Sequence, residues 1–385
     1  MKILAITSIR SEYDLLTPLF FKLKSDQDIQ LKLLVGGAHN SPTFGYTCSD
    51  IKNDGFEILL EIESLIDANS KSGRLKSAAV LLISAIDVCK QYNPDLIIYA
   101  GDREEVMIGA LLGGYLGIPT LHFYGGDHAA DGHIDNPIRH AVSKLSTCHF
   151  VSTEEHENRL LSMKEPDFRI FNIGSIALDK FRTTSFNDHI VNKVALREII
   201  KPTALVIFHP IEEEIEVAHE IIFNILNSLI ILGYHCFVGL PNTDPGNIDI
   251  RNAIQRLAST KEDITVYGNL CREDFLSLFQ SSSLIIGNSS AGILEAASIP
   301  IPCVNVGSRQ LGRTSGSNVI FVGAKSHDIE KGIQKASSNA FRSTFVNMRN
   351  PYGDGYSSER AYSLIKSVDF KSMLAKKEDP LDDKS

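Results

Sequence analysis

Short apolar runs alternate along this chain with longer segments in which apolar residues recur at helical spacing. Each run stops at a glycine or a polar residue, which is typical of strands buried on both faces of a sheet. We expect strands at 2–7, 29–35, 96–100, 120–124, 149–152 and 168–173, and then at 204–208, 235–239, 264–267, 284–287, 302–306 and 319–322. The strands alternate with expected helices, and this order predicts parallel, doubly wound sheets of the α/β class.

The strand–helix alternation occurs twice, with a polar segment that lacks periodicity between the two occurrences. That segment is FRTTSFND, residues 181–188, and we place a domain boundary there. A chain of 385 residues is long enough for two domains, each with its own core. A last helix is expected over Ser357–Ser367, followed by a charged tail.

The stretch 284–313 carries the main functional signal of the second half. A strand ends just before Asn288-Ser289-Ser290, which supply helix N-cap residues, and a helix is expected over Ala291–Ala297. A strand, a polar turn and a helix in this order direct backbone N–H groups and the positive end of a helix dipole at one point, which suits a phosphate. The alternative is that the two serines only cap a helix.

Charged side chains complete this predicted cradle. Glu295 lies about one turn into the expected helix, where a carboxylate can accept hydrogen bonds from both hydroxyls of a ribose. The next strand delivers Arg309 and Arg313, whose forked, permanently charged donors fit a diphosphate. Because they all follow the C-terminal ends of neighbouring strands, these residues together favour a nucleoside diphosphate site over solvated arginines.

The first half instead gathers acidic and imidazole side chains after its strands. The sequence GDREE, which includes Asp102, follows one strand, and Asp127 follows the next. Asp135, Arg139 and His140 come soon afterwards, at the start of an expected helix. Carboxylates and imidazoles grouped in this way suit general acid–base catalysis, whereas the alternative is a capped and salt-bridged helix start.

Three further positions lie at the ends of expected strands. Arg10 lies in the SIRSEY loop and is either an anion ligand or part of a surface ion pair, while His39 and Asp179 are titratable groups after later strands. The SIRSEY loop lacks the glycines of a dinucleotide fingerprint, so no nicotinamide or flavin cofactor is expected. The histidines at 128, 133 and 140 do not match HExxH and no cysteine accompanies them, so no catalytic metal is expected either.

Composition narrows the class of protein. The net charge of −9 gives no basic surface for nucleic acid or anionic lipid. Six scattered cysteines without a CxxC pair indicate reduced thiols. Met1-Lys2 leads directly into a strand, so no signal peptide is expected, and no apolar run is long enough to span a bilayer. We therefore expect a cytoplasmic protein.

Several motifs in order resemble those of a known family. GDREE, HFYGGD, GHIDNPIRHAVSKL, IFHP, PNTDPG, GNSSAGILEAA, VNVGSRQLGR and NPYGDG are together similar to the hydrolysing UDP-N-acetylglucosamine 2-epimerases of the sialic (nonulosonic) acid pathway. The resemblance covers nearly the whole chain. It implies two Rossmann-like domains facing a cleft, as in GT-B glycosyltransferases, with no metal and no nicotinamide cofactor. The domains would be residues 1–182, joined by a C-terminal helix at about 357–370, and residues 183–356, with association into a homodimer or homotetramer.

The resemblance also implies a reaction. Such an enzyme removes the C2 proton of UDP-GlcNAc, expels UDP from C1 and hydrates the resulting 2-acetamidoglucal to ManNAc. The residues implied to bind UDP are Arg10, Arg103, His209, Asn242, Gly268, Asn269, Phe275, Ser289, Ser290, Glu295, Arg309 and Arg313. The implied catalytic residues are His39, Asp102, Asp127, Asp135, His140, Asp179 and His209, and which of them takes the C2 proton is left open.

One residue departs from the family pattern. Asp127 stands where the family more often has glutamate, and the shorter side chain draws its carboxylate back by about one C–C bond. Either a water or a backbone shift compensates, or the substrate differs. We place UDP-GlcNAc first and UDP-2,4-diacetamido-2,4,6-trideoxyglucose, of legionaminic acid synthesis, second. A non-hydrolysing 2-epimerase, a retaining glycosyltransferase and a non-catalytic UDP-sugar sensor are the remaining alternatives.

Overall fold

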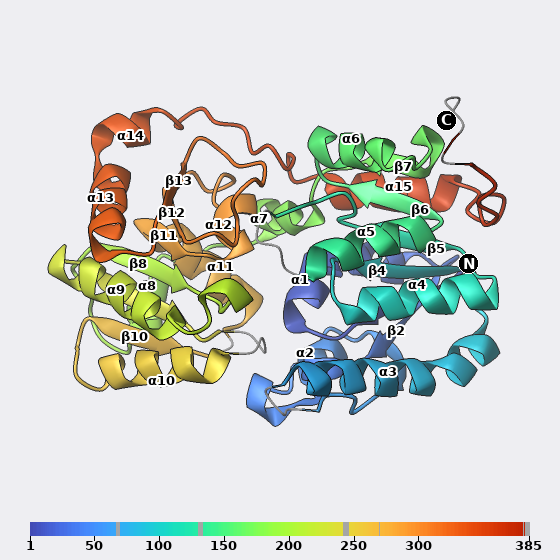
Figure 1. The fold of residues 1–385 in the computed structure, drawn as a ribbon, viewed down its shortest axis with the longest axis horizontal. Helices are drawn as coiled ribbons and strands as arrows, with labels where there is room; N and C mark the ends of the chain where they lie inside the picture. The colour runs from blue at the N-terminus through green and yellow to red at the C-terminus, as the bar shows by residue number, and fades with distance from the viewer. Residues whose placement is uncertain (67–69, 130–133, 242–245, 269, 380, 382–385) are drawn as a thin grey trace. The chain divides into compact units, whose positions relative to one another are not determined.

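The chain folds into two compact units, each built on its own parallel sheet (Figure 1). A computed structural model describes residues 1–66, 70–129, 134–241, 246–268, 270–379 and 381. Unit 1 is formed by the described residues of Met1–His128, Ile134–Lys180 and Tyr352–Ser385, and unit 2 chiefly by those of Phe181–Pro351. No helix among these residues is long and apolar enough to cross a membrane.

Unit 1 contains, within the described residues, a sheet of seven parallel strands in the order β3-β2-β1-β4-β5-β6-β7. The central strands are buried on both faces, as their continuous apolar runs predict. The edge strand β3 is half-exposed and was not expected from the sequence. The strands are β1 (Lys2–Thr7), β2 (Gln30–Val35), β3 (Glu57–Glu61), β4 (Leu96–Ala100), β5 (Thr120–Phe123), β6 (Cys148–Val151) and β7 (Ile170–Asn172).

Helices cover both faces of the first sheet. The helix pairs α3 and α4, and α4 and α5, pack side by side, whereas α1 packs against α15 on the other face (Figure 1). The helices are α1 (Arg10–Ser25), α2 (Cys48–Asn53), α3 (Lys71–Tyr92), α4 (Glu104–Leu116), α5 (Asp135–Leu145), α6 (Glu154–Ser162) and α15 (Ser357–Ser367), with 3-10 turns at Gly37–Asn40, Pro42–Phe44, Asp167–Arg169 and Ile176–Leu178. Helix α7 (Asp179–Thr183) leads into unit 2.

Unit 2 repeats this plan with six parallel strands, counted over its described residues, in the order β10-β9-β8-β11-β12-β13. They are β8 (Thr203–Ile207), β9 (His235–Gly239), β10 (Ile264–Tyr267), β11 (Leu284–Gly287), β12 (Cys303–Val306) and β13 (Val319–Val322). The helices are α8 (Ile190–Ala195), α9 (Ala218–Ile231), α10 (Asn247–Ala258), α11 (Arg272–Ser281), α12 (Ser290–Leu294), α13 (Ser326–Ser337) and α14 (Asn339–Ser343), with a 3-10 turn at Glu212–Glu214. Two doubly wound parallel sheets are the class that the sequence predicts.

Each sheet has one point at which the strand order reverses. In unit 1 the reversal lies between β1 and β4, and in unit 2 it lies between β8 and β11. Helices leave neighbouring strands toward opposite faces at such a point, so a crevice opens beyond the carboxyl ends of the strands, and ligands of doubly wound proteins bind there. The loops after β1, β4, β8 and β11 are therefore where a ligand is expected.

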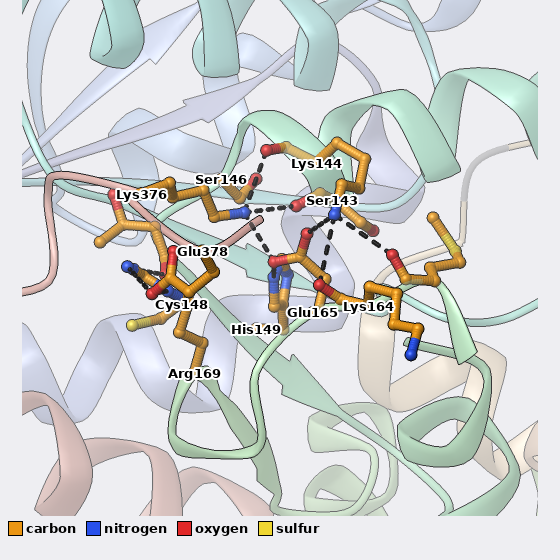
Figure 2. A network of polar contacts seen from close by, with 12 residues as sticks. Ser143, Lys144, Ser146, Cys148, His149, Lys164, Glu165, Arg169, Lys376 and Glu378 are labelled. Carbon is orange, nitrogen blue, oxygen red and sulfur yellow. Dashed lines mark hydrogen bonds and ion pairs between the residues drawn. The ribbon is translucent and has the colours of Figure 1, made fainter. Parts of the chain in front are cut away.

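The chain returns from unit 2 to complete unit 1. The Asp179 carboxylate accepts the backbone N–H groups of Ser357 at 3.0 Å and of Ser358 at 2.7 Å, and so fixes the start of α15. Further on, Arg169 forms an ion pair with Glu378 at 2.8 Å (Figure 2). Its guanidinium also donates to the carbonyls of Met373 and Ala375. These contacts hold the segment after α15 against unit 1.

Candidate active site

Asn288 organises the end of the central strands in unit 2. This fully buried side chain accepts from the backbone N–H of His209 and donates to its carbonyl, both at 2.8 Å. Gly287 makes the close approach of β11 and β8 possible, because it has φ of 134° and a Cβ there would lie 2.0 Å from the Ile207 carbonyl oxygen. His209 is thereby held beside the start of α12, at the reversal point of the sheet.

The serines lie where the sequence predicts a phosphate cradle, but the helix after them is shorter than expected. Ser289 is the N-cap of α12, with its hydroxyl 3.3 Å from the Ala291 amide nitrogen, and Ser290 is exposed. The expectation of a helix through Ala297 is wrong, since α12 ends at Leu294. The physical reason is Asn350, whose amide donates to the Leu294 carbonyl at 2.8 Å and terminates the helix.

A five-residue helix has a small dipole, so the charge for an anion must come mainly from side chains. Arg309 donates to the Asn288 carbonyl at 3.3 Å, and Gln310 donates to the same oxygen at 3.0 Å. Arg313 donates to the Gln310 side chain at 2.8 Å. Both predicted arginines thus lie beside the start of α12, and Gln310, which the sequence did not single out, connects them.

Two acidic side chains accompany this cradle. Glu295 is buried directly after α12, and its backbone N–H donates to the Ala291 carbonyl at 2.9 Å. Glu214 was missed in the sequence, and its carboxylate accepts the Ser308 backbone N–H at 3.2 Å. Burial raises the pKa of Glu214 above its ordinary value, against the lowering effect of the hydrogen bonds from Ser308. A raised pKa favours the neutral form of this carboxyl, and the neutral form does not repel a diphosphate.

The remaining predicted nucleotide residues are less connected. Gly268 follows β10 and is exposed. Phe275 lies in α11 with its ring 5.9 Å from that of Phe279, and it packs partly against the core. Asn242 and Asn269 lie outside the described residues.

In unit 1, a single guanidinium joins two of the predicted catalytic carboxylates. Arg139, from the first half of α5, forms ion pairs with Asp102, after β4, and with Asp127, after β5, the second at 2.9 Å. The Arg139 side chain is only 4% exposed. A buried guanidinium favours the ionised form of both carboxylates, since it would otherwise be an uncompensated charge.

Asp127 has two further neighbours. The backbone N–H of His128 donates to its carboxylate at 2.8 Å, and the buried His156 has its Nε2 atom 3.4 Å from the same group. The sequence placed Asp127 and Arg139 in one cluster but gave no sign of His156. Because His156 is in α6, only the pairing of β5 with β6 brings it to the site.

Two histidines and an ion-paired carboxylate lie at the start of α5. The rings of His128 and His140 stack with centroids 5.5 Å apart, and their facing nitrogens are 3.2 Å apart. Burial, and then the neighbouring His128, lower the pKa of His140, so the ring is neutral at pH 7. Asp135 pairs at 3.1 Å with Arg74 of α3, a residue that no sequence motif marks.

The other predicted residues of unit 1 lie at helix starts or have a structural environment. Arg10 is the first residue of α1, 3.5 Å from Asp14, and Arg103 is the N-cap residue of α4. His39 is fully buried, with its two ring nitrogens 3.0 Å and 2.8 Å from the hydroxyls of Thr7 and Thr47. The catalytic roles of His39, and of Asp179 at the start of α15, stay predictions for which the geometry offers no further support.

Comparison with known proteins identifies a family that matches most of the chain. The family model described as UDP-N-acetylglucosamine 2-epimerase matches residues 21–366. The chain is 32% identical, over 98% of both sequences, to UDP-N,N'-diacetylbacillosamine 2-epimerase (hydrolyzing) of Legionella pneumophila. It is 31% identical to GDP/UDP-N,N'-diacetylbacillosamine 2-epimerase (hydrolyzing) of Campylobacter jejuni, over 89% of this chain and 88% of that protein.

A solved structure supports the same conclusion at the level of the fold. The crystal structure of UDP-GlcNAc 2-epimerase from Neisseria meningitidis, bound to UDP-GlcNAc, superposes with a TM-score of 0.80 at 20% identity, and the match covers 95% of this chain and all of that one. The predicted GT-B-like fold class and the resemblance noted in the sequence are both confirmed. The chain belongs to the UDP-N-acetylglucosamine 2-epimerase family.

Proposed function

We propose that this protein is a hydrolysing 2-epimerase that converts a UDP-linked 2-acetamido sugar and water into UDP and the free sugar inverted at C2. The observation that carries this proposal is the match over 98% of both chains to a relative named as a hydrolysing 2-epimerase. The name of that relative specifies the hydrolysing reaction, in which the sugar is released. It therefore favours hydrolysis over the alternative reaction of the family, in which the nucleotide is returned to the sugar.

The proposed reaction needs a base, a site for the leaving diphosphate and an acid. Removal of the C2 proton and breakage of the C1–oxygen bond release UDP and leave a 2-acetamidoglucal. Water then adds its oxygen to C1, and a proton is delivered to C2 on the other face. No redox change occurs, because the elements of UDP lost in the first step are replaced by those of water in the second.

We assign the base and the acid to unit 1. Asp102 and Asp127 are kept ionised by Arg139, and His140 is neutral at pH 7 because its pKa is lowered, so each can accept a proton. The diphosphate is assigned to the cradle of unit 2, where Arg309 and Arg313 provide fixed positive charge beside Ser289. Charge that develops on the leaving UDP would be stabilised there.

For the substrate, the names of two relatives lead us to reverse the order in which the sequence analysis placed the two sugars. Two relatives, at 32% and 31% identity, are named for N,N'-diacetylbacillosamine, which is the 2,4-diacetamido-2,4,6-trideoxy sugar placed second above. Asp127, where the resemblance leads us to expect glutamate, is compatible with a different sugar in the pocket. We therefore favour UDP-N,N'-diacetylbacillosamine, with UDP-GlcNAc, for which the family is named, as the second candidate.

We also propose that the protein acts in the cytoplasm as a homo-oligomer. Its six cysteines are all free thiols, which suits a reducing compartment. Helix α3 exposes an apolar strip formed by Leu75, Ala79, Ile83 and Ile86, in which Leu75 and Ile83 are 74% and 73% exposed. Exposed apolar side chains aligned on one helix face favour burial against a second copy of the chain.

A proton NMR time course in D2O, run with each of the two UDP-sugars, tests the reaction. We expect UDP and a free sugar that is inverted and deuterated at C2, with faster turnover of the diacetamido sugar. Faster turnover of UDP-GlcNAc would overturn the substrate order, and a UDP-linked epimer as product would overturn the hydrolysing reaction.

An Asp102→Asn variant separates an enzyme from a sensor. We expect it to bind UDP as the unchanged protein does and to lose product formation by roughly a hundredfold or more, because one carboxylate of the proposed acid–base set is gone. Asp354→Asn is the matched control, since Asp354 is an exposed carboxylate paired with Arg360. Unchanged turnover in the Asp102 variant would remove this residue from the mechanism.

A further inference from the structure

Two buried carboxyl groups meet at the reversal point of the first sheet, outside the set that the proposed mechanism uses. Glu12 lies in the first turn of α1, after β1, and Glu105 lies in the first turn of α4, after β4. The two side chains belong to residues that are 7% and 2% exposed. Since β1 and β4 are neighbours, the two helix starts face the crevice at which doubly wound proteins bind ligands.

The hydrogen bonds of this pair require a proton. Glu12 accepts the backbone N–H of Ser8 on Oε2 at 3.1 Å, and the carboxyl groups of Glu12 and Glu105 are close enough for a hydrogen bond between them if one is protonated. The Oε1 atoms of both are buried and receive no N–H or O–H from any described residue. Two ionised carboxylates only accept, so a bond between them exists when one carries a proton.

The surrounding charges favour the same state. Burial, and then the charge of Glu105, raise the pKa of Glu12 well above its ordinary value, and burial likewise raises that of Glu105. Arg103 opposes the shift on both, whereas Glu104 increases it on Glu105. The one charge that remains lies in the first turn of two helices, where the helix dipoles stabilise it.

Other charged groups on the elements packed against α1 and α4 are engaged elsewhere. Arg74 of α3 pairs with Glu104 and Asp135, and Arg139 of α5 pairs with Asp102 and Asp127. On α1, Arg10 pairs with Asp14, Lys22 with Glu359, and Lys24 donates to the Asp54 carbonyl. On α15, Arg360 pairs with Asp354 and Lys366 with Asp26, and in the loop after β2 the neutral His39 contacts Thr7 and Thr47.

We propose that Glu12 and Glu105 share one proton and act as a positioning pair for the two loops that carry Arg10 and Arg103. Glu12 holds the N–H of Ser8, two residues before Arg10, and Glu105 follows Arg103 by two residues. Loss of the shared proton places two like charges together in a buried site, which separates the helix starts and misaligns the arginines. Substrate affinity should therefore weaken as the pH rises. The part played by the arginines rests on the proposed function, whereas the shared proton does not.

The protonation state is tested without turnover, by NMR of the full chain labelled with 13C at the glutamate side-chain carboxyl. Spectra of Glu12→Gln and Glu105→Gln variants assign the two signals. We expect the pair to titrate in two coupled steps, the second well above the range of the exposed glutamates. Two signals that titrate together with the exposed glutamates would overturn the proposal.

The positioning role is tested by KM and kcat across the neutral and alkaline range, and by UDP affinity from calorimetry. The Glu105→Gln side chain has a permanent N–H donor toward Glu12, so we expect near-normal KM at neutral pH and no alkaline rise in KM. The Glu105→Ala variant lacks that donor, so we expect KM and the UDP dissociation constant to be roughly tenfold higher at every pH, with a smaller change in kcat. Glu57→Gln, at an exposed carboxylate paired with Lys32, is the matched control.

Rescue by glutamine but not by alanine supports a positioning pair. Equal impairment of both folded variants at neutral pH, or an alkaline rise in KM that persists in Glu105→Gln, would overturn it. If neither UDP-sugar reacts with the unchanged protein, the proposed function fails. The NMR titration still tests whether the two carboxyl groups share a proton, and the UDP affinities still test whether the pair aligns the two loops.

Discussion

The histidines of unit 1 show how burial determines what a titratable side chain can do. Burial lowers the pKa of His39 to about 4 and that of His122 to about 3, although the Nε2–H of His122 donates to the Gly101 carbonyl at 2.9 Å. Both rings are therefore neutral across the physiological range. Their positions in the sequence do not reveal this, because burial on all sides is a property of the assembled sheet.

These depressed pKa values predict a loss of stability in acid. Below pH 6.5 the unfolded chain binds protons at these histidines, while folded His39 does not until about pH 4, so the free energy of unfolding falls as the pH drops through this window. At about 1.4 kcal/mol per pKa unit, His39 accounts for roughly 3 kcal/mol. Urea unfolding of His39→Gln at neutral and acidic pH should show a correspondingly smaller loss than the unchanged protein.

The exposed His219 provides the control for this measurement. A His219→Gln variant should lose as much stability in acid as the unchanged protein. If the His39→Gln variant loses as much stability in acid as the unchanged protein, the pKa of His39 does not differ between the folded and the unfolded chain.

At the scale of elements, the sequence predicts best where burial leaves little choice. Leu96–Ala100 and Leu284–Gly287 have the bounds expected, because a strand covered on both faces must be apolar throughout. The edge strand Glu57–Glu61 has charged ends and one partner, and its half-exposed apolar run of Ile58–Leu60 does not mark it as a buried strand. The early end of α12 depends on Asn350, which is distant in the sequence, and no local pattern reports such a contact.

The same distinction applies to the candidate site. Carboxylates and arginines at strand ends could be identified because a charged residue directly after a buried strand must face either the ligand crevice or solvent. Arg74 and His156 could not, since each lies within a helix rather than at a strand end and reaches the site only through helix packing. Glu12 and Glu105 lie within the SIRSEY and GDREE sequences, but only the structure shows that their side chains lie close together.

The segment after α15 gives a prediction at this scale. Glu165 is buried, forms ion pairs with Lys144 at 2.7 Å and Lys376 at 2.6 Å, and is hydrogen-bonded to His149 at 3.1 Å (Figure 2). Burial alone would raise its pKa, but the hydrogen bond from His149 and the nearby lysines lower it to about 2. We expect Glu165→Gln to cost about 1–3 kcal/mol in urea unfolding, because the partly exposed Lys144 and Lys376 lose their counter-charge and the buried His149 loses a charged hydrogen-bond partner.

Hydrogen exchange locates the effect of that substitution. Amides of residues 373–378, next to Lys376, should exchange faster in the Glu165 variant than in the unchanged protein. Glu155→Gln is the control, as Glu155 pairs with Arg159 on the surface and such pairs are worth at most about 1 kcal/mol. Equal stability of the two variants would show that the buried network contributes no net free energy.

At the scale of the whole molecule, the strip on α3 predicts the state of association. We expect light scattering to give a mass larger than one chain, and Ile83→Glu to shift it toward the monomer, since a buried charge at an interface is costly. Ile231→Glu is the control, because Ile231 is similarly exposed, at 65%, but lies on α9 of unit 2. A monomeric unchanged protein would contradict the proposed oligomer.

Because the chain returns to unit 1 after unit 2, unit 1 is completed only late in the synthesis of the protein. Arg169 and Asp179 emerge from the ribosome long before their partners in residues 357–378, and all of unit 2 is translated in between. Until then the fully buried Arg169 has neither Glu378 nor the carbonyls of Met373 and Ala375 to bind. A nascent chain that stops early therefore carries an incomplete first unit, and translation to the end of α15 and the segment after it is what lets that unit close.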